Sequence, residues 1–133
     1  MVVDHIGYAI KDIVKAKEEF EKFGFEFGEV VEDTDRNILI QFGENGGYRI
    51  ELIQTMNDEE PSPVKEILKK NGPTPYHLCY KTKDIEQELR RLKAEKWMVV
   101  AEPKRAIAFG DGVRVSFLFK RSIGMIELVE EKD

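Results

Sequence analysis

Cysteine, long apolar runs and a leader segment are all scarce or missing in this chain of 133 residues. The single cysteine, Cys79, excludes an intramolecular disulfide. No apolar run approaches the roughly 20 residues of a membrane span, and no N-terminal apolar segment precedes a small-residue cleavage site. We therefore expect a cytoplasmic protein without a membrane partner.

An excess of positive charge is missing as well. The chain has 21 Lys and Arg against 26 Asp and Glu, a formal net charge of −5. General nucleic-acid binding needs a concentrated basic face, so a nucleic-acid partner is not expected. A small molecule or another protein is the better candidate. The hydrophobic content of 41% suffices for the core of one ordinary domain.

Hydrophobic periodicity and turn residues predict two copies of one order of elements, namely a strand, a helix and three strands. The first copy is expected to have strands at 2–10, 25–31, 38–42 and 48–54 and a helix at 13–23. A short helix is expected at 64–70. The second copy is expected to have strands at 76–82, 97–100, 113–119 and 125–129 and a helix at 84–96. We expect α+β modules at residues 1–72 and 73–133 that together form one domain.

The repeat is also visible in the residues themselves. The nine residues from His5 to Ile13 align without a gap on those from His77 to Ile85, and five of the nine positions are identical. Both histidines of the chain occupy the same place in the two copies. A gene duplication explains this register better than coincidence does.

The last strand of each copy places a glutamate among aliphatic residues. Glu51 stands between Ile50 and Leu52, 46 residues after His5, and Glu127 stands between Ile126 and Leu128, 50 residues after His77. An unpaired carboxylate buried there would cost several kcal/mol or take up a proton. A compensating partner is therefore expected.

Two imidazoles and two carboxylates form a ligand set suited to a borderline divalent ion. Taken alone, a histidine at the start of a strand is more often structural or on the surface, and either glutamate alone could face solvent. The symmetry of the two pairs favours metal binding by His5, Glu51, His77 and Glu127.

These motifs resemble the vicinal oxygen chelate superfamily, which includes glyoxalases, bleomycin resistance proteins and dioxygenases. The resemblance covers nearly the whole chain, and it is strongest to the branch of methylmalonyl-CoA epimerase and bacterial glyoxalase I. It rests on Asp4-His5-Ile6-Gly7, Ile50-Glu51-Leu52, Tyr76-His77-Leu78-Cys79-Tyr80 with Asp84-Ile85, Ile126-Glu127-Leu128-Val129, and the epimerase-like Ser62-Pro63-Val64-Lys65. It implies two βαβββ modules in a half-open mixed barrel around one divalent metal ion, such as Ni, Co, Zn or Mn.

The resemblance also implies a reaction. A substrate carbonyl of a thioester or hemithioacetal would be polarised by the metal while a carboxylate moves a proton at the adjacent carbon. Glu127 is the first choice for this base, and Glu51 is a ligand or the second proton-transfer group. The reaction implied is that of a methylmalonyl-CoA epimerase or, as the alternative, of glyoxalase I (lactoylglutathione lyase). A homodimer is expected from the same resemblance.

Departures from the family pattern leave the substrate open. Many epimerases have a histidine where this chain has Tyr76, and a His-Pro-Lys where it has Phe119-Lys120-Arg121. Five basic residues could receive CoA phosphates or a glutathione carboxylate, although a solvated charged loop explains them at least as well. These residues are Lys104, Arg105, Arg114, Lys120 and Arg121.

Two other functions on the same fold are kept as alternatives. An Fe(II) dioxygenase uses two histidines and one glutamate with open coordination positions, so a fourth protein ligand counts against it. A small-molecule-binding resistance protein usually lacks the four ligands altogether.

The remaining aromatic residues and the cysteine are interpreted as structural. Phe20, Phe23, Phe25 and Phe27 are expected to pack the first helix on its sheet, as Trp97 does in the second copy. Phe117 and Phe119 are assigned to the core or, alternatively, to the lining of the pocket. Cys79 is expected in the core, with its side chain on the helix side of the sheet.

Overall fold

The computed structural model describes residues 1–131 and divides the chain into two compact units. One unit is His5–Tyr76, and the other combines residues 1–4 with the residues from His77 onward. The described residues form nine strands, three α-helices and one 3-10 helix. This confirms the predicted α+β class. None of these helices has the length and apolar content required to cross a bilayer.

In the unit His5–Tyr76, four strands pair in the order β2-β4-β5-β1, and a fifth strand, β3, also pairs with β4. β1 and β5 are parallel, whereas the other pairs are antiparallel. The elements are β1 (Val2–Ala9, which begins in the other unit), α1 (Ile13–Glu21), β2 (Glu26–Phe27), β3 (Val31–Asp33), β4 (Ile38–Asn45), β5 (Tyr48–Thr55) and the linking helix α2 (Lys65–Asn71).

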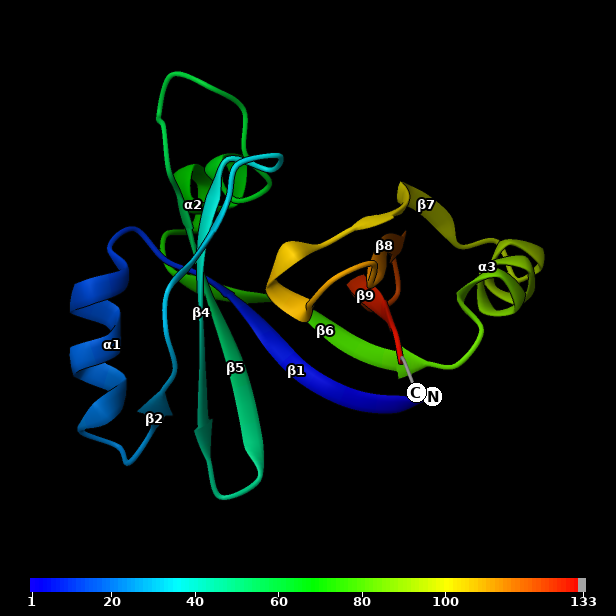
Figure 1. The fold of residues 1–133 in the computed structure, drawn as a ribbon. Coiled ribbons are helices and arrows are strands. Elements are labelled where there is room, and N and C mark those ends of the chain that lie inside the picture. The colour runs from blue at the N-terminus through cyan, green and yellow to red at the C-terminus, as the bar shows by residue number, and fades with distance from the viewer. Residues whose placement is uncertain (132–133) are drawn as a thin grey trace. The chain divides into compact units, whose positions relative to one another are not determined.

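Helix α1 begins where the sequence predicts, because Asp12 caps it. One oxygen of the Asp12 carboxylate accepts the backbone N–H groups of Val14 and Lys15, at 3.0 and 3.2 Å. The helix covers one face of β4 and β5 (Figure 1). Its side of the sheet carries the core of Ile10, Ile13, Ile50 and Leu52, against which Phe20, Phe25 and Phe27 pack. The opposite face of this sheet does not take part in the core under α1.

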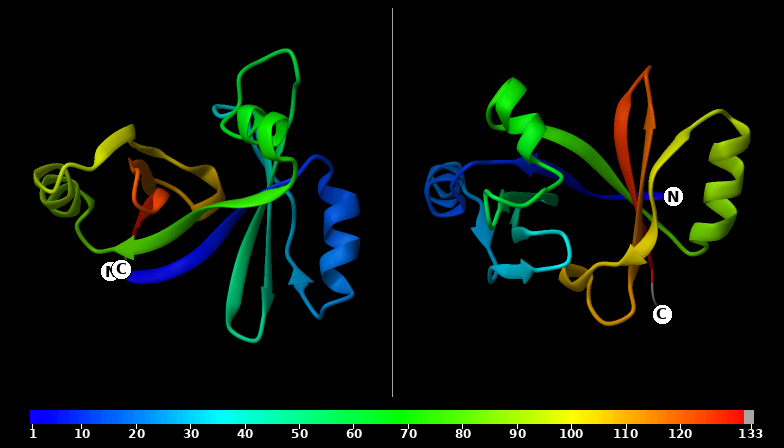
Figure 2. Two further views of the ribbon diagram at one scale, coloured as in Figure 1. Left: turned by 180° about the vertical axis from the view of Figure 1, so that it is seen from behind. Right: turned by 90° about the horizontal axis from the view of Figure 1, so that it is seen from above.

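The second unit repeats this plan with the order β6-β9-β8-β7, in which β6 and β9 are parallel. Asp84 caps its helix by accepting the N–H of Gln87 at 3.0 Å. Figure 2 shows this helix beside the strands of its own unit, and Trp97 packs into the core between them, as expected. The elements are β6 (Thr74–Thr82), α3 (Ile85–Ala94), β7 (Met98–Arg105), the 3-10 helix Ile107–Phe109, β8 (Arg114–Lys120) and β9 (Gly124–Glu130).

Three local expectations are wrong. The strand expected at 25–31 is two short strands that separate at Gly28, and both pair with β4. β7 continues to Arg105, because its pairing with β8 resumes after irregularities on either side of Ala101. Phe23 does not pack in the core, since it follows the end of α1 and is 75% exposed.

Gly43 on β4 lies opposite Phe27 on β2, and the aromatic ring occupies the space that a larger residue would need. A Cβ at Gly43 would come within 2.4 Å of the Phe27 ring. The contact of the Phe27 ring with Gly43 therefore helps to hold β2, an edge strand of two residues, on the sheet.

We expect Gly43→Ala to lower the free energy of unfolding by about 1–3 kcal/mol, because the added methyl group must displace Phe27. Chemical denaturation measures this change. The matched control is Gly28→Ala, where a Cβ would meet no atom within 4 Å; it should stay within about 1 kcal/mol of the wild type. Equal stability of the two variants would contradict the packing argument.

Candidate metal centre

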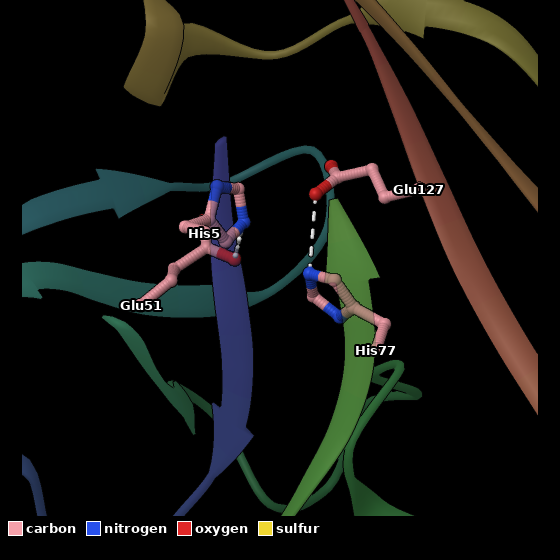
Figure 3. A group of neighbouring side chains, drawn as sticks. All are labelled: His5, Glu51, His77 and Glu127. Atoms are coloured by element: carbon pink, nitrogen blue, oxygen red, sulfur yellow. Dashed lines mark ion pairs between the residues drawn. The ribbon is translucent and has the colours of Figure 1, made fainter. Parts of the chain in front are cut away.

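The first candidate pair is His5 on β1 and Glu51 on β5. Gly7 lies directly opposite Glu51 in the parallel pairing, so His5 is two residues away on the same face of the sheet. Nε2 of His5 lies 3.2 Å from Oε1 of Glu51, and the two side chains are 0% and 4% exposed. This contact is one of the dashed lines in Figure 3. Sheet register therefore brings together two residues that are far apart in sequence.

The second pair, His77 on β6 and Glu127 on β9, repeats this arrangement. Cys79 lies opposite Glu127, and His77 again stands two residues before the opposite position. Nε2 of His77 lies 3.1 Å from Oε1 of Glu127, as drawn in Figure 3, and both side chains are buried. The duplication inferred from sequence thus extends to the geometry inside each unit.

A phenylalanine from a neighbouring strand contacts the histidine of each pair. Phe42 on β4 lies opposite Glu51, and Phe117 on β8 lies opposite Glu127. The ring of Phe42 meets His5 at 5.4 Å between centroids and 78°, and Phe117 meets His77 at 5.4 Å and 87°. These edge contacts hold both imidazoles in equivalent orientations.

The sequence analysis did not identify Phe42, and it assigned Phe117 either to the core or to the lining of the pocket. A signal was present, because Phe42 stands nine residues before Glu51 and Phe117 stands ten before Glu127. The offset of one residue between the hairpins hides the match from a gapless alignment. The structure places both rings on the histidine side of their sheets.

The donor atoms of each pair fit a shared metal ion. Metal–nitrogen and metal–oxygen bonds of about 2.1 Å place two neighbouring ligands of one ion roughly 3 Å apart, close to the observed 3.1 and 3.2 Å. Neutral imidazole and ionised carboxylate are also the forms that ligate. A direct imidazolium–carboxylate ion pair is the alternative compensation for each buried glutamate.

Cys79 is buried, as predicted, but the expectation that it faces the helix is wrong. It packs with Ala106, Val113, Val115 and Val129, and Phe117 borders the same cluster. Positions two apart on a strand share a face, so Cys79 lies on the face of His77. The alignment already implied this, because Cys79 matches Gly7.

Arg114 and Lys120 belong to the five basic residues considered for binding an anionic substrate, and both make contacts within their own unit. Arg114 pairs with Glu86 at 2.9 Å and with Glu130. The hydrogen bond to Glu86, assisted by Glu130, raises the pKa of the Arg114 guanidinium above its ordinary value. Lys120 donates to the backbone oxygen of Glu95 at 2.7 Å. Both contacts anchor elements of the second unit to each other.

Comparison with solved structures finds the same fold. The hypothetical protein BH1468 from Bacillus halodurans C-125 has a TM-score of 0.86 at 24% identity, with 98% of this chain and 94% of that chain covered. Methylmalonyl-CoA epimerase from Mycobacterium tuberculosis has a TM-score of 0.84 at 25% identity, with 99% and 89% covered.

A variant of Streptomyces coelicolor methylmalonyl-CoA epimerase in complex with 2-nitronate-propionyl-CoA has a TM-score of 0.84 at 23% identity, with 100% and 99% covered. A comparison with curated proteins finds no match. The family model of the Glyoxalase/Bleomycin resistance protein/Dioxygenase superfamily matches residues 4–117. Since this match spans most of the chain, the protein belongs to that superfamily.

Proposed function

We propose that His5, Glu51, His77 and Glu127 bind one divalent metal ion, and that the protein is an epimerase-like enzyme acting on a CoA thioester. The observation that carries this proposal is the pair of equivalent buried His–Glu contacts, one in each unit. Two carboxylates and two neutral imidazoles would balance the charge of a divalent ion. Such nitrogen and oxygen donors suit Ni, Co, Zn or Mn.

The substrate class is inferred from the structural neighbours. Two of them are methylmalonyl-CoA epimerases, and one of these holds a CoA thioester analogue. Glyoxalase I activity on a hemithioacetal remains the alternative, because the same ligands suit both reactions. A fourth protein ligand counts against an Fe(II) dioxygenase, which uses three.

When bound, the metal would supply a positive charge that stabilises negative charge on the substrate oxygen. Glu127 removes the proton from the carbon next to the carbonyl, and Glu51, in its protonated form, donates another proton to the opposite side of that carbon; exchange with solvent then resets both carboxyl groups. Phe42 and Phe117 exclude water from the two carboxylates. Each histidine holds its glutamate in a fixed orientation.

His5→Ala and His77→Ala are each expected to weaken metal binding by at least roughly 100-fold, because loss of a ligand costs more than loss of its supporting contacts. Metal content after dialysis, measured by atomic emission, tests this, with about one ion per chain in the wild type.

The control is Val115→Ala, which shortens a buried residue on the histidine face that has no ligand atom, and which should retain the ion. If either histidine variant kept the wild-type metal content, the ligand assignment would be wrong. A fall from two ions to one in each variant would instead indicate two separate sites.

Methylmalonyl-CoA in heavy water should gain deuterium at the carbon next to the thioester. At saturating metal, Glu127→Gln should slow this exchange by about 10²–10⁴-fold, the usual contribution of a positioned base. Glu51→Gln should block inversion of configuration more than exchange, because Glu127 still removes the proton. Mass spectrometry and chiral analysis follow the two outcomes.

A parallel assay with methylglyoxal and glutathione separates the two candidate reactions. Activity there, with no deuterium exchange in methylmalonyl-CoA, would replace the epimerase assignment by glyoxalase I. Absence of activity in both assays would contradict both named reactions.

A further inference from the structure

A cavity of about 370 Å³ lies in the unit His5–Tyr76, away from the candidate metal ligands. Its walls come from the end of β1, the end of β5 with the loop that follows, and helix α2. Ile10 directly follows β1 and Thr55 is the last residue of β5, so the cavity lies at the carboxyl ends of these two parallel strands. Its lining includes none of the four candidate metal ligands.

Hydrogen bonds within the unit hold the walls of this cavity in place. The hydroxyl group of Thr55, in the lining, lies 2.6 Å from that of Ser62 in the loop before α2. Nζ of Lys65, on α2, donates to the backbone oxygen of Asp58 in the same loop. The cavity is therefore formed by the fold itself, as small-molecule sites usually are.

Positive charge prevails in the lining, although the whole chain has a net charge of −5. Two lysines, Lys11 and Lys65, line the cavity against a single acid, Asp58. The ammonium group of Lys11 makes no hydrogen bond or ion pair within residues 1–131. Lys65 has two further N–H donors beyond the one that it gives to the loop. An anion is the ligand that these groups would attract.

Gln54 distinguishes this cavity from the corresponding place in the second unit. Its Oε1 accepts the backbone N–H of Ile13 at 2.8 Å, which leaves its Nε2 as a donor in the lining. The residue three positions after the second candidate ligand, Glu127, is Glu130, and its carboxylate pairs with Arg114. A carboxylate would repel an anion, whereas the neutral amide of Gln54 can donate to one. Only the first copy therefore carries a donor at this position.

We propose that this cavity binds a small phosphate monoester. Lysines act as point charges that suit a phosphate dianion, whereas a planar carboxylate is best matched by the edge of an arginine, and none of the lining residues described is an arginine. Ile10, Met56 and Leu68 provide apolar surface for the organic part of the ligand. The volume of the cavity suits a small molecule. This inference does not rest on the proposed metal centre.

Calorimetry with three probes tests the proposal. They are phenyl phosphate, benzoate as a carboxylate with the same ring, and inorganic phosphate as the anion without an organic part. One phenyl phosphate should bind in the cavity of each chain, and more tightly than either of the other probes. Its affinity in metal-loaded protein should be unchanged after the metal is removed with a chelator, because no candidate metal ligand lines the cavity.

Three variants locate the binding. Gln54→Glu introduces the residue of the second copy and keeps the acceptor for Ile13, and it should weaken phenyl phosphate binding at least about 10-fold, the loss expected when a hydrogen bond to a charged group is removed. Lys11→Gln should weaken it by a similar factor. The matched control is Lys83→Gln, the same change at the equivalent place of the repeat, and it should bind like the wild type. Thermal unfolding should be the same in all three variants, which separates binding from a structural defect.

Four results would overturn the proposal. Equal weakening by Lys11→Gln and Lys83→Gln would show general attraction by surface charge. Tighter binding of benzoate would assign the cavity to carboxylates, and loss of binding after chelation would assign the phosphate to the metal centre. A wild type that bound no phenyl phosphate at millimolar concentration would leave the cavity without this function.

Discussion

A carboxylate buried in an aliphatic strand is the constraint on which each unit of this protein depends. Glu51 and Glu127 are both 3% exposed, and a charge in such surroundings costs several kcal/mol unless another group compensates it. In both units an imidazole on the parallel neighbouring strand contacts the carboxylate and can compensate it. The strand register must therefore be exact at this point, because a slip of one residue would turn the histidine to the helix face.

The two faces of each sheet accordingly have separate tasks. Helices α1 and α3 cover one face with aliphatic and aromatic side chains. The other face carries the polar pair and the phenylalanine that contacts its histidine, and in the second unit it also carries the apolar cluster around Cys79. The sheet therefore lies between each ligand pair and the core under its helix.

Much of this arrangement could be predicted, because local sequence patterns determine it. The Asp-Ile pairs at 12–13 and 84–85 mark helix starts, and both helices begin there. The alternation of side chains fixes which residues share a face with each histidine. The same alternation places Cys79 on the face of His77, two residues further along β6, which is where the structure has it.

Other features depend on contacts between distant residues and leave little trace in a single sequence. The extension of β7 through Pro103 follows from its partner strand, not from its own turn-rich composition. The match between Phe42 and Phe117 is hidden by a one-residue offset, and the contact of Phe42 with His5 forms only when β4, β5 and β1 pair. The sequence accordingly predicts the ligands better than it predicts their neighbours.

The parallel pairing of β1 with β5 also defines the smallest piece of chain that carries half of the candidate centre. The β4–β5 hairpin, closed by a turn in which Gly46 and Gly47 both have positive φ, contains Glu51 and Phe42 but no histidine. A parallel partner strand needs a crossover connection, which α1 and the following strands provide. A hairpin alone would therefore hold one carboxylate and no imidazole, and half of the candidate centre requires the whole segment from β1 to β5.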